Sequence, residues 1–119
     1  MTPEAFRLTR PARQETSVIF SSPHSGRDYP ADFLEQSQLD PHVLRSSEDA
    51  YVDRLFARAP LHGAPLLCAN APRAYIDLNR AADELDPAVI EGVARMAPNP
   101  RISSGLAVLP RVVPGGRPI

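Results

Sequence analysis

The sequence of 119 residues contains no lysine and only one cysteine. All thirteen basic residues are arginines, which excludes a lysine nucleophile or Schiff base and leaves arginine or a metal ion as the only fixed cations. Cys68 alone cannot form an internal disulfide or a multi-cysteine zinc site, and its apolar surroundings, APLLCAN, predict a buried side chain. A reactive thiol is the less favoured interpretation.

Strong charge and long apolar runs are also missing. The formal net charge is -1 and the arginines form no basic run, so nucleic acid is not expected as a partner. No segment approaches the roughly 18 apolar residues of a membrane span, and the N-terminus has no apolar core of signal-peptide length. We therefore expect a cytoplasmic protein without a membrane partner.

The residues that are present predict an α/β fold in a single domain over residues 1–119. Residues 1–15 are polar and contain three arginines and two prolines, which indicates a loose N-terminal lead-in. The runs Thr16–Ser21 and Pro65–Ala69 have the composition of buried strands. Pro30–Gln36, which starts with proline and carries two apolar anchors, predicts a short helix.

A clearer helical pattern follows. The sequence SSED at residues 46–49 resembles a capping box, and apolar residues then recur at helical spacing up to Ala59, before Pro60. After it, RAYIDLN alternates cleanly, which predicts a strand over residues 73–79. Residues 81–100 look like a surface excursion with a short helical segment at 87–93, and the PGG near the end is a turn signal with little after it.

His24 lies just past the first predicted strand, where sites gather in open α/β sheets. Gly26 allows the backbone to turn so that the imidazole can point into a cleft. A zinc ligand and a turn histidine bonded to a serine are both open interpretations of His24. His42 and His62 lie beside proline or glycine, with no element to orient them, and are not expected to bind metal.

Glu48 and Asp49 open the predicted helix, where carboxylates are favoured by capping and by the helix dipole whether or not they bind a ligand. A histidine at a strand end and a carboxylate at a helix start would together form part of a zinc site. Further along, Arg73, Asn79 and Arg80 could hold a substrate carboxylate. The alternative for these arginines is structural pairing with Asp77, Asp83 or Glu84.

Together and in this order, SSPHSG, SEDAYVDRLF, APRAYIDLNR and the tail LPRVVPGGRPI resemble the N-formylglutamate amidohydrolase family. The resemblance runs from about Val18 to the end of the chain. It implies a three-layer α/β fold around a mixed sheet, of the phosphorylase/hydrolase-like kind found in zinc carboxypeptidases. It also implies a metal-dependent amidase, with one Zn²⁺ or another divalent ion, that hydrolyses N-formyl-L-glutamate to formate and L-glutamate at the end of a histidine-degradation route.

Residue by residue, the resemblance makes His24 and Asp49 metal ligands, with Glu48 as the neighbouring candidate. It makes Arg73, Asn79 and Arg80 the clamp for a small acidic N-acyl amino acid. Family members are roughly twice as long as this chain, so the third zinc histidine and the general base are expected outside it, and we expect a fragment with no complete catalytic set. The alternatives are an amidase for another N-acyl amino acid and a non-catalytic carboxylate-binding relative.

Overall fold

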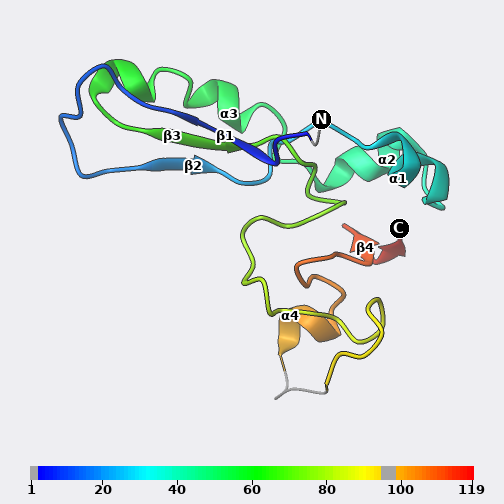
Figure 1. The fold of residues 1–119 in the computed structure, drawn as a ribbon. Helices are drawn as coiled ribbons and strands as arrows, with labels where there is room; N and C mark the ends of the chain where they lie inside the picture. The colour runs from blue at the N-terminus through cyan, green and yellow to red at the C-terminus, as the bar shows by residue number, and fades with distance from the viewer. Residues whose placement is uncertain (1–2, 95–98) are drawn as a thin grey trace.

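The computed structural model describes residues 3–94 and 99–119, in which short strands and helices are joined by long loops (Figure 1). None of the helices in these residues is long and apolar enough to cross a membrane. In chain order the elements are β1 (Phe6–Thr9), β2 (Phe20–Ser22), α1 (Ala31–Gln36), α2 (Pro41–Leu44), the 3₁₀ helix η1 (Arg45–Ser47), α3 (Val52–Leu55), the 3₁₀ helix η2 (Ala59–His62), β3 (Leu66–Ala69), α4 (Pro100–Ser103), β4 (Val112–Val113) and β5 (Arg117–Pro118).

Three of the strands form a mixed sheet in the order β1-β3-β2. β2 runs parallel to β3, with Phe20 opposite Leu66, and β1 runs antiparallel to it, with Phe6 opposite Ala69. The expectation of a mixed sheet with helices is thus confirmed. The expectation that residues 1–15 are a loose lead-in is wrong for β1, because the free edge of β3 supplies a backbone partner that local composition does not reveal.

One face of this sheet is packed against the segment that carries α3 and η2. Phe20, Leu66 and Cys68 point to this face, where Ala59 and Ala64 complete a small core. The rings of Phe20 and Phe56 lie 5.2 Å apart between centroids. Cys68 is buried as expected, and burial raises the pKa of its thiol. The strand expected over residues 16–21 is shorter and less buried than predicted, since Val18 and Ile19 are exposed.

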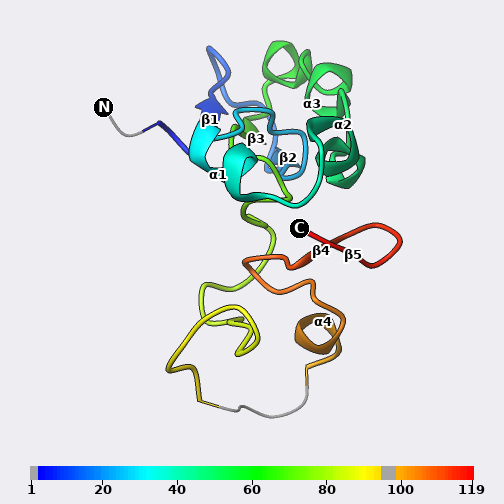
Figure 2. The same cartoon turned by 90° about the vertical axis from the view of Figure 1, so that its right-hand side faces the viewer.

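A second core joins residues 29–44 to Ala74 and to the C-terminal end of the chain. Leu39, Leu44, Ala74 and Val113 are its buried members, with partly buried side chains around them. These surrounding residues are Tyr29, Phe33, Leu34, Val43 and Ile119. The core brings α1 and α2 together with the segment around Ala74 and with the hairpin β4–β5, as Figure 2 shows. It thereby fixes the position of the hairpin, which forms one wall of the candidate active site.

The predicted helices are confirmed in one case and wrong in another. α1 matches the helix expected at Pro30–Gln36. The helix expected from residue 46 to residue 59 is reduced to α3, and Tyr51 before it has a left-handed φ of 65°. Ser46 does not cap it, since its hydroxyl donates to the Val43 carbonyl. The physical reason is a long-range contact, because the Asp49 N–H donates to the His24 carbonyl and draws residues 48–51 away from helical geometry.

The strand predicted at residues 73–79 is also wrong. The segment is a series of turns in which the N–H groups of Tyr75 and Ile76 both donate to the Pro72 carbonyl. Ala74 and Asp77 are buried while Tyr75 and Asn79 are exposed, so burial does not follow the alternation of the sequence.

Residues 87–93 likewise form turns instead of the short helix expected there. Residues 95–98 of the predicted excursion lie outside the described residues. The PGG turn is followed by a strand after all, because Gly115 and Gly116, both with positive φ, close the hairpin between β4 and β5.

Candidate active site

His24 is held in a compact loop directly after β2. Ser22 and Ser25 share a hydrogen bond between their hydroxyls at 2.6 Å, and the Ser25 hydroxyl donates to the Asp49 carbonyl at 2.7 Å. The Asp49 N–H in turn donates to the His24 carbonyl at 2.9 Å. Backbone contacts therefore hold His24 and Asp49 together although they lie 25 residues apart in the sequence.

Gly26 allows this loop to lie directly against the residues that follow β3. A Cβ atom at Gly26 would lie 2.6 Å from the Asn70 carbonyl oxygen, so only glycine fits without a shift of the backbone. The Asp28 N–H donates to the same carbonyl at 3.0 Å. The glycine expected to let the backbone turn thus permits a close approach of two chain segments, which brings His24 towards residues 70–80.

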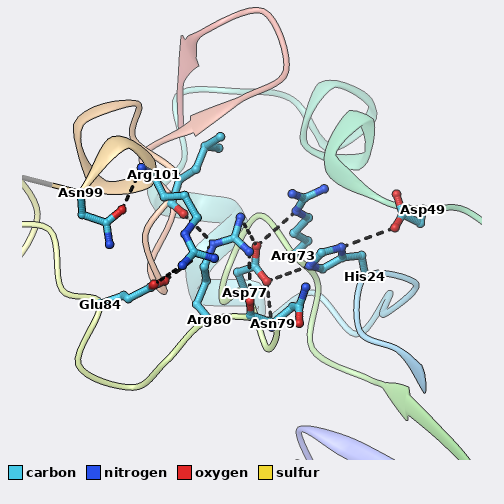
Figure 3. A network of polar contacts seen from close by, with 10 residues as sticks. His24, Asp49, Arg73, Asp77, Asn79, Arg80, Glu84, Asn99 and Arg101 are labelled. Carbon is cyan, nitrogen blue, oxygen red and sulfur yellow. Dashed lines mark hydrogen bonds and ion pairs between the residues drawn. The ribbon is translucent and has the colours of Figure 1, made fainter. Parts of the chain in front are cut away.

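Asp77 is the partner of His24 on this second segment. Its side chain is 2% exposed, and its Oδ1 lies 2.7 Å from His24 Nε2 and accepts a hydrogen bond from the Asn79 N–H at 2.9 Å (Figure 3). Burial alone would raise the pKa of Asp77, but the hydrogen bonds from His24 and Asn79 and the charges of His24 and Arg80 outweigh it and lower the pKa from 3.8 to about 2. Asp77 is therefore an ionised acceptor.

An ionised Asp77 determines which nitrogen of His24 carries hydrogen. A carboxylate can only accept, so Nε2 must donate, and the lone pair of a neutral imidazole is left on Nδ1. Nδ1 faces Asp49, whose Oδ2 lies 3.4 Å away and whose side chain is 54% exposed. An imidazole lone pair and a carboxylate oxygen attract each other only when a proton or another cation lies between them.

The separation of these two atoms suits a zinc ion. Nitrogen and oxygen ligands about 2.0–2.1 Å from a tetrahedral zinc lie about 3.3–3.4 Å apart, and imidazole and carboxylate are both common zinc ligands. The described residues hold no cluster of three or more His, Cys, Asp or Glu side chains that could bind a metal. His24 and Asp49 thus fit as two ligands of a zinc site, but the described residues supply no third.

Glu48, the other predicted ligand, is engaged elsewhere. Its carboxylate accepts a hydrogen bond from the Tyr29 hydroxyl at 2.7 Å and another from Arg45 Nε at 3.4 Å. Its side chain is almost fully buried, and burial together with the bond to Glu48 raises the pKa of Tyr29. These contacts give Glu48 a structural role between the loop before α1 and η1, so Asp49 is the better ligand candidate.

The two predicted substrate-binding arginines differ in what they contact. Arg80 is largely buried and donates to the carbonyls of Leu106 and Asn79, each at 2.9 Å, while its third nitrogen lies 3.5 Å from Asp77 Oδ2. Arg73 uses only Nε, at 3.4 Å from Asp77 Oδ2. Its terminal nitrogens have no hydrogen-bond partner in the described part of the chain, and the Asn79 side chain, which Figure 3 shows beside His24, is exposed. Arg73 is therefore the available cation.

Arg73 and Asp77 line a cavity of about 360 Å³ that is closed on its other side by the hairpin and the residues before it. The lining is mostly apolar, with Leu106, Val112 and Val113 among its members. A small ligand with one acidic end could lie here, with its acid on the Arg73 guanidinium. The hairpin, which the sequence indicated only as a turn, contributes this wall.

Comparisons with known proteins identify the family of the chain. The N-formylglutamate amidohydrolase family matches residues 16–119. The crystal structure of N-formylglutamate amidohydrolase from Ralstonia eutropha JMP134 superimposes with a TM-score of 0.83 at 38% sequence identity, covering 97% of this chain and 41% of that one. No curated protein matches the chain. This chain spans well under half of that solved structure, and it belongs to the N-formylglutamate amidohydrolase family.

Proposed function

We propose that this chain forms part of a metal-dependent amidohydrolase that cleaves N-formyl-L-glutamate into formate and L-glutamate, the last reaction of a histidine-degradation route. The observation that carries the proposal is the Asp77–His24–Asp49 arrangement beside a cavity that contains Arg73. The proposal also includes a fold like that of the zinc carboxypeptidases, for which the mixed sheet with helices is the support.

The residues of this chain have separate tasks in the proposed site. Asp77 keeps the hydrogen of His24 on Nε2, so that Nδ1 and the Asp49 carboxylate are both directed at the same point as metal ligands. When bound, zinc supplies Lewis-acid chemistry for polarising the formyl carbonyl and activating water. The third ligand and the general base belong to parts of the site outside these residues.

Arg73 binds and orients the substrate. The substrate carries two carboxylates, and the terminal nitrogens of Arg73 offer a planar pair of donors at the edge of the cavity. Holding the substrate by its acid fixes the position of its amide bond relative to His24 and Asp49, which lowers the entropic part of the barrier. The apolar wall formed by Leu106 and the hairpin excludes water from the rest of the substrate.

Titration of zinc into the purified chain tests the metal site. We expect His24→Ala to weaken zinc binding at least about ten-fold, because one of two ligands is removed. The exposed His42 provides a matched control, and His42→Ala should leave the affinity unchanged. Equal zinc affinity of the His24→Ala variant and the unchanged chain would show that the site is assigned wrongly.

Binding of N-formyl-L-glutamate to the zinc-loaded chain tests the substrate site. Arg73→Ala should weaken it at least about ten-fold, since a charge-assisted pair of hydrogen bonds is lost. The control is Arg101→Ala, because Arg101 is exposed, pairs with Glu84 at an N–O distance of 2.6 Å and does not line the cavity. An Arg73→Ala variant that binds as well as the control would remove the basis for an acidic substrate.

A further inference from the structure

Ser47, the last residue of η1, is buried but its hydroxyl has no hydrogen-bond partner among the described residues. Ser47 is 7% exposed, and the side chains on either side of it in the sequence are hydrogen-bonded. In the described part of the chain, the side-chain oxygens that are fully enclosed without a partner belong to Asp53 and Glu84. The Ser47 hydroxyl is therefore not enclosed, and it lines the same cavity as Arg73.

Other serines of the chain show where such a hydroxyl ordinarily bonds. Ser22 and Ser25 are also buried, and their hydroxyls bond to each other at 2.6 Å. Ser46 and Ser103 lie in short helices, and each donates to the carbonyl three residues earlier, at 2.6 and 3.1 Å. Buried polar groups are nearly always hydrogen-bonded. An open hydroxyl on the wall of a cavity therefore indicates a group that bonds to what the cavity holds.

The cavity offers one positive charge to a substrate that has two carboxylates. Among the described residues that line it, Arg73 is the cation and Asp77 the anion, and the rest of the wall is mostly apolar. One carboxylate occupies the terminal nitrogens of Arg73. A second carboxylate beside ionised Asp77 needs a donor of its own. Ser47 and Ser104 are the hydroxyl donors of the lining, and of these two Ser47 is the buried one.

We propose that the Ser47 hydroxyl donates a hydrogen bond to the substrate carboxylate that Arg73 does not hold, and thereby selects N-acyl amino acids with two acidic groups. Leu44, three residues earlier, is fully buried in the second core, so η1 is fixed in place before a ligand binds. A ligand with an apolar group in place of the second carboxylate would leave the hydroxyl unpaired, which is the kind of mismatch that separates similar substrates most strongly. This inference rests on the proposed function, because it takes N-formyl-L-glutamate as the substrate.

Thermal denaturation tests the open hydroxyl without any ligand. Ser47→Ala should keep the Tm of the unchanged chain, because the hydroxyl has no bond within the chain to lose. Ser22→Ala is the matched comparison, since Ser22 is equally buried but bonded to Ser25, and it should lower the Tm by a few degrees. A loss of Tm in Ser47→Ala as large as in Ser22→Ala would overturn the proposal, because Ser47 would then have a partner inside the chain.

Isothermal titration calorimetry of the zinc-loaded chain with N-formyl-L-glutamate tests the contact itself. Ser47→Ala should weaken binding about ten-fold, because a hydrogen bond to a charged group is lost. Ser46→Ala is the control and should bind as the unchanged chain does, since Ser46 is exposed and does not line the cavity. Undiminished binding by Ser47→Ala would overturn this inference alone. An unchanged chain that does not bind N-formyl-L-glutamate would overturn the proposed function together with it.

Two analogues with a single carboxylate show which acid each residue holds. N-formyl-L-norvaline lacks the side-chain carboxylate of the substrate, and N-formyl-4-aminobutyrate lacks the carboxylate on Cα. Ligand-detected NMR measures their weaker binding. Ser47→Ala should weaken the binding of one analogue and Arg73→Ala that of the other. If both variants weaken the same analogue, the two residues hold one carboxylate and the proposal is wrong.

Discussion

Replacing Asp77 with asparagine removes the charge that orients His24 and keeps the shape of the side chain. The pKa of Asp77 is lowered from 3.8 to about 2 in the folded chain, so ionised Asp77 favours the folded state. A difference of about 1.8 pKa units corresponds to roughly 2 kcal/mol of folding free energy. Because the pKa is depressed by folding, this stabilisation is complete above the unfolded pKa of 3.8 and is lost as the pH falls through about 2.

Urea denaturation of the unchanged chain and of Asp77→Asn across the range from pH 7 to pH 2 measures this contribution. The free energies of unfolding should differ by about 2 kcal/mol at pH 7, by about half as much near pH 3 and little at pH 2, where neutral Asp77 resembles asparagine. Asp83→Asn is the control, because Asp83 is exposed. A difference that stays constant with pH would refute the argument that the charge of Asp77 stabilises the fold through His24 and its neighbours.

Arg80→Ala should lower the free energy of unfolding by about 2 kcal/mol in urea denaturation, because the carbonyls of Leu106 and Asn79 lose a buried charged donor. If the variant were as stable as the unchanged chain, these hydrogen bonds would not stabilise the fold, and substrate binding would be the remaining role of Arg80. Gly26→Ala should destabilise the chain by about 1–3 kcal/mol, because the added Cβ would meet the Asn70 carbonyl oxygen at 2.6 Å. Differential scanning calorimetry measures this loss of stability, and an unchanged Tm would contradict the close packing of the loop around Gly26 against the residues that follow β3.

Local signals in the sequence predicted those elements that local interactions hold. α1 and β3 lie where composition and flanking residues placed them, because a proline start and a compact apolar run act within a few residues. The helix after Glu48 is mostly absent because the backbone of Asp49 binds that of His24, a contact that periodicity cannot show. The alternation in residues 73–79 is misleading, since that segment winds in turns and buries Ala74 and Asp77, three positions apart.

The candidate site, too, could be predicted only where residue type and local position were informative. His24, Asp49 and Arg73 could be singled out by residue type and by their place beside predicted elements. In the structure His24 lies 3.4 Å from Asp49, and both His24 and Arg73 contact Asp77 (Figure 3). The contact between Asp77 and His24 could not be predicted, because the two residues lie 53 positions apart and the polar pattern around Asp77 predicted a strand. Residue type did not separate adjacent Glu48 and Asp49, and only the resemblance placed Asp49 first. In the structure the two side chains have different partners, since Glu48 accepts from Tyr29 and Asp49 faces His24.

The antiparallel pairing of β1 with β3 has a consequence for how the protein is made. Arg7 in β1 bonds to Asn70, 63 residues later, so the first strand leaves the ribosome 63 residues ahead of the segment that it contacts. At about 5–20 residues per second, that interval lasts on the order of 3–13 s. During it, Phe6 and Leu8 have no strand to pair with, and a newly made chain is open to chaperones and to aggregation. Slower translation of residues 10–66 would prolong this exposure, so the yield of soluble protein should depend on the speed of synthesis as well as on the stability of the finished fold.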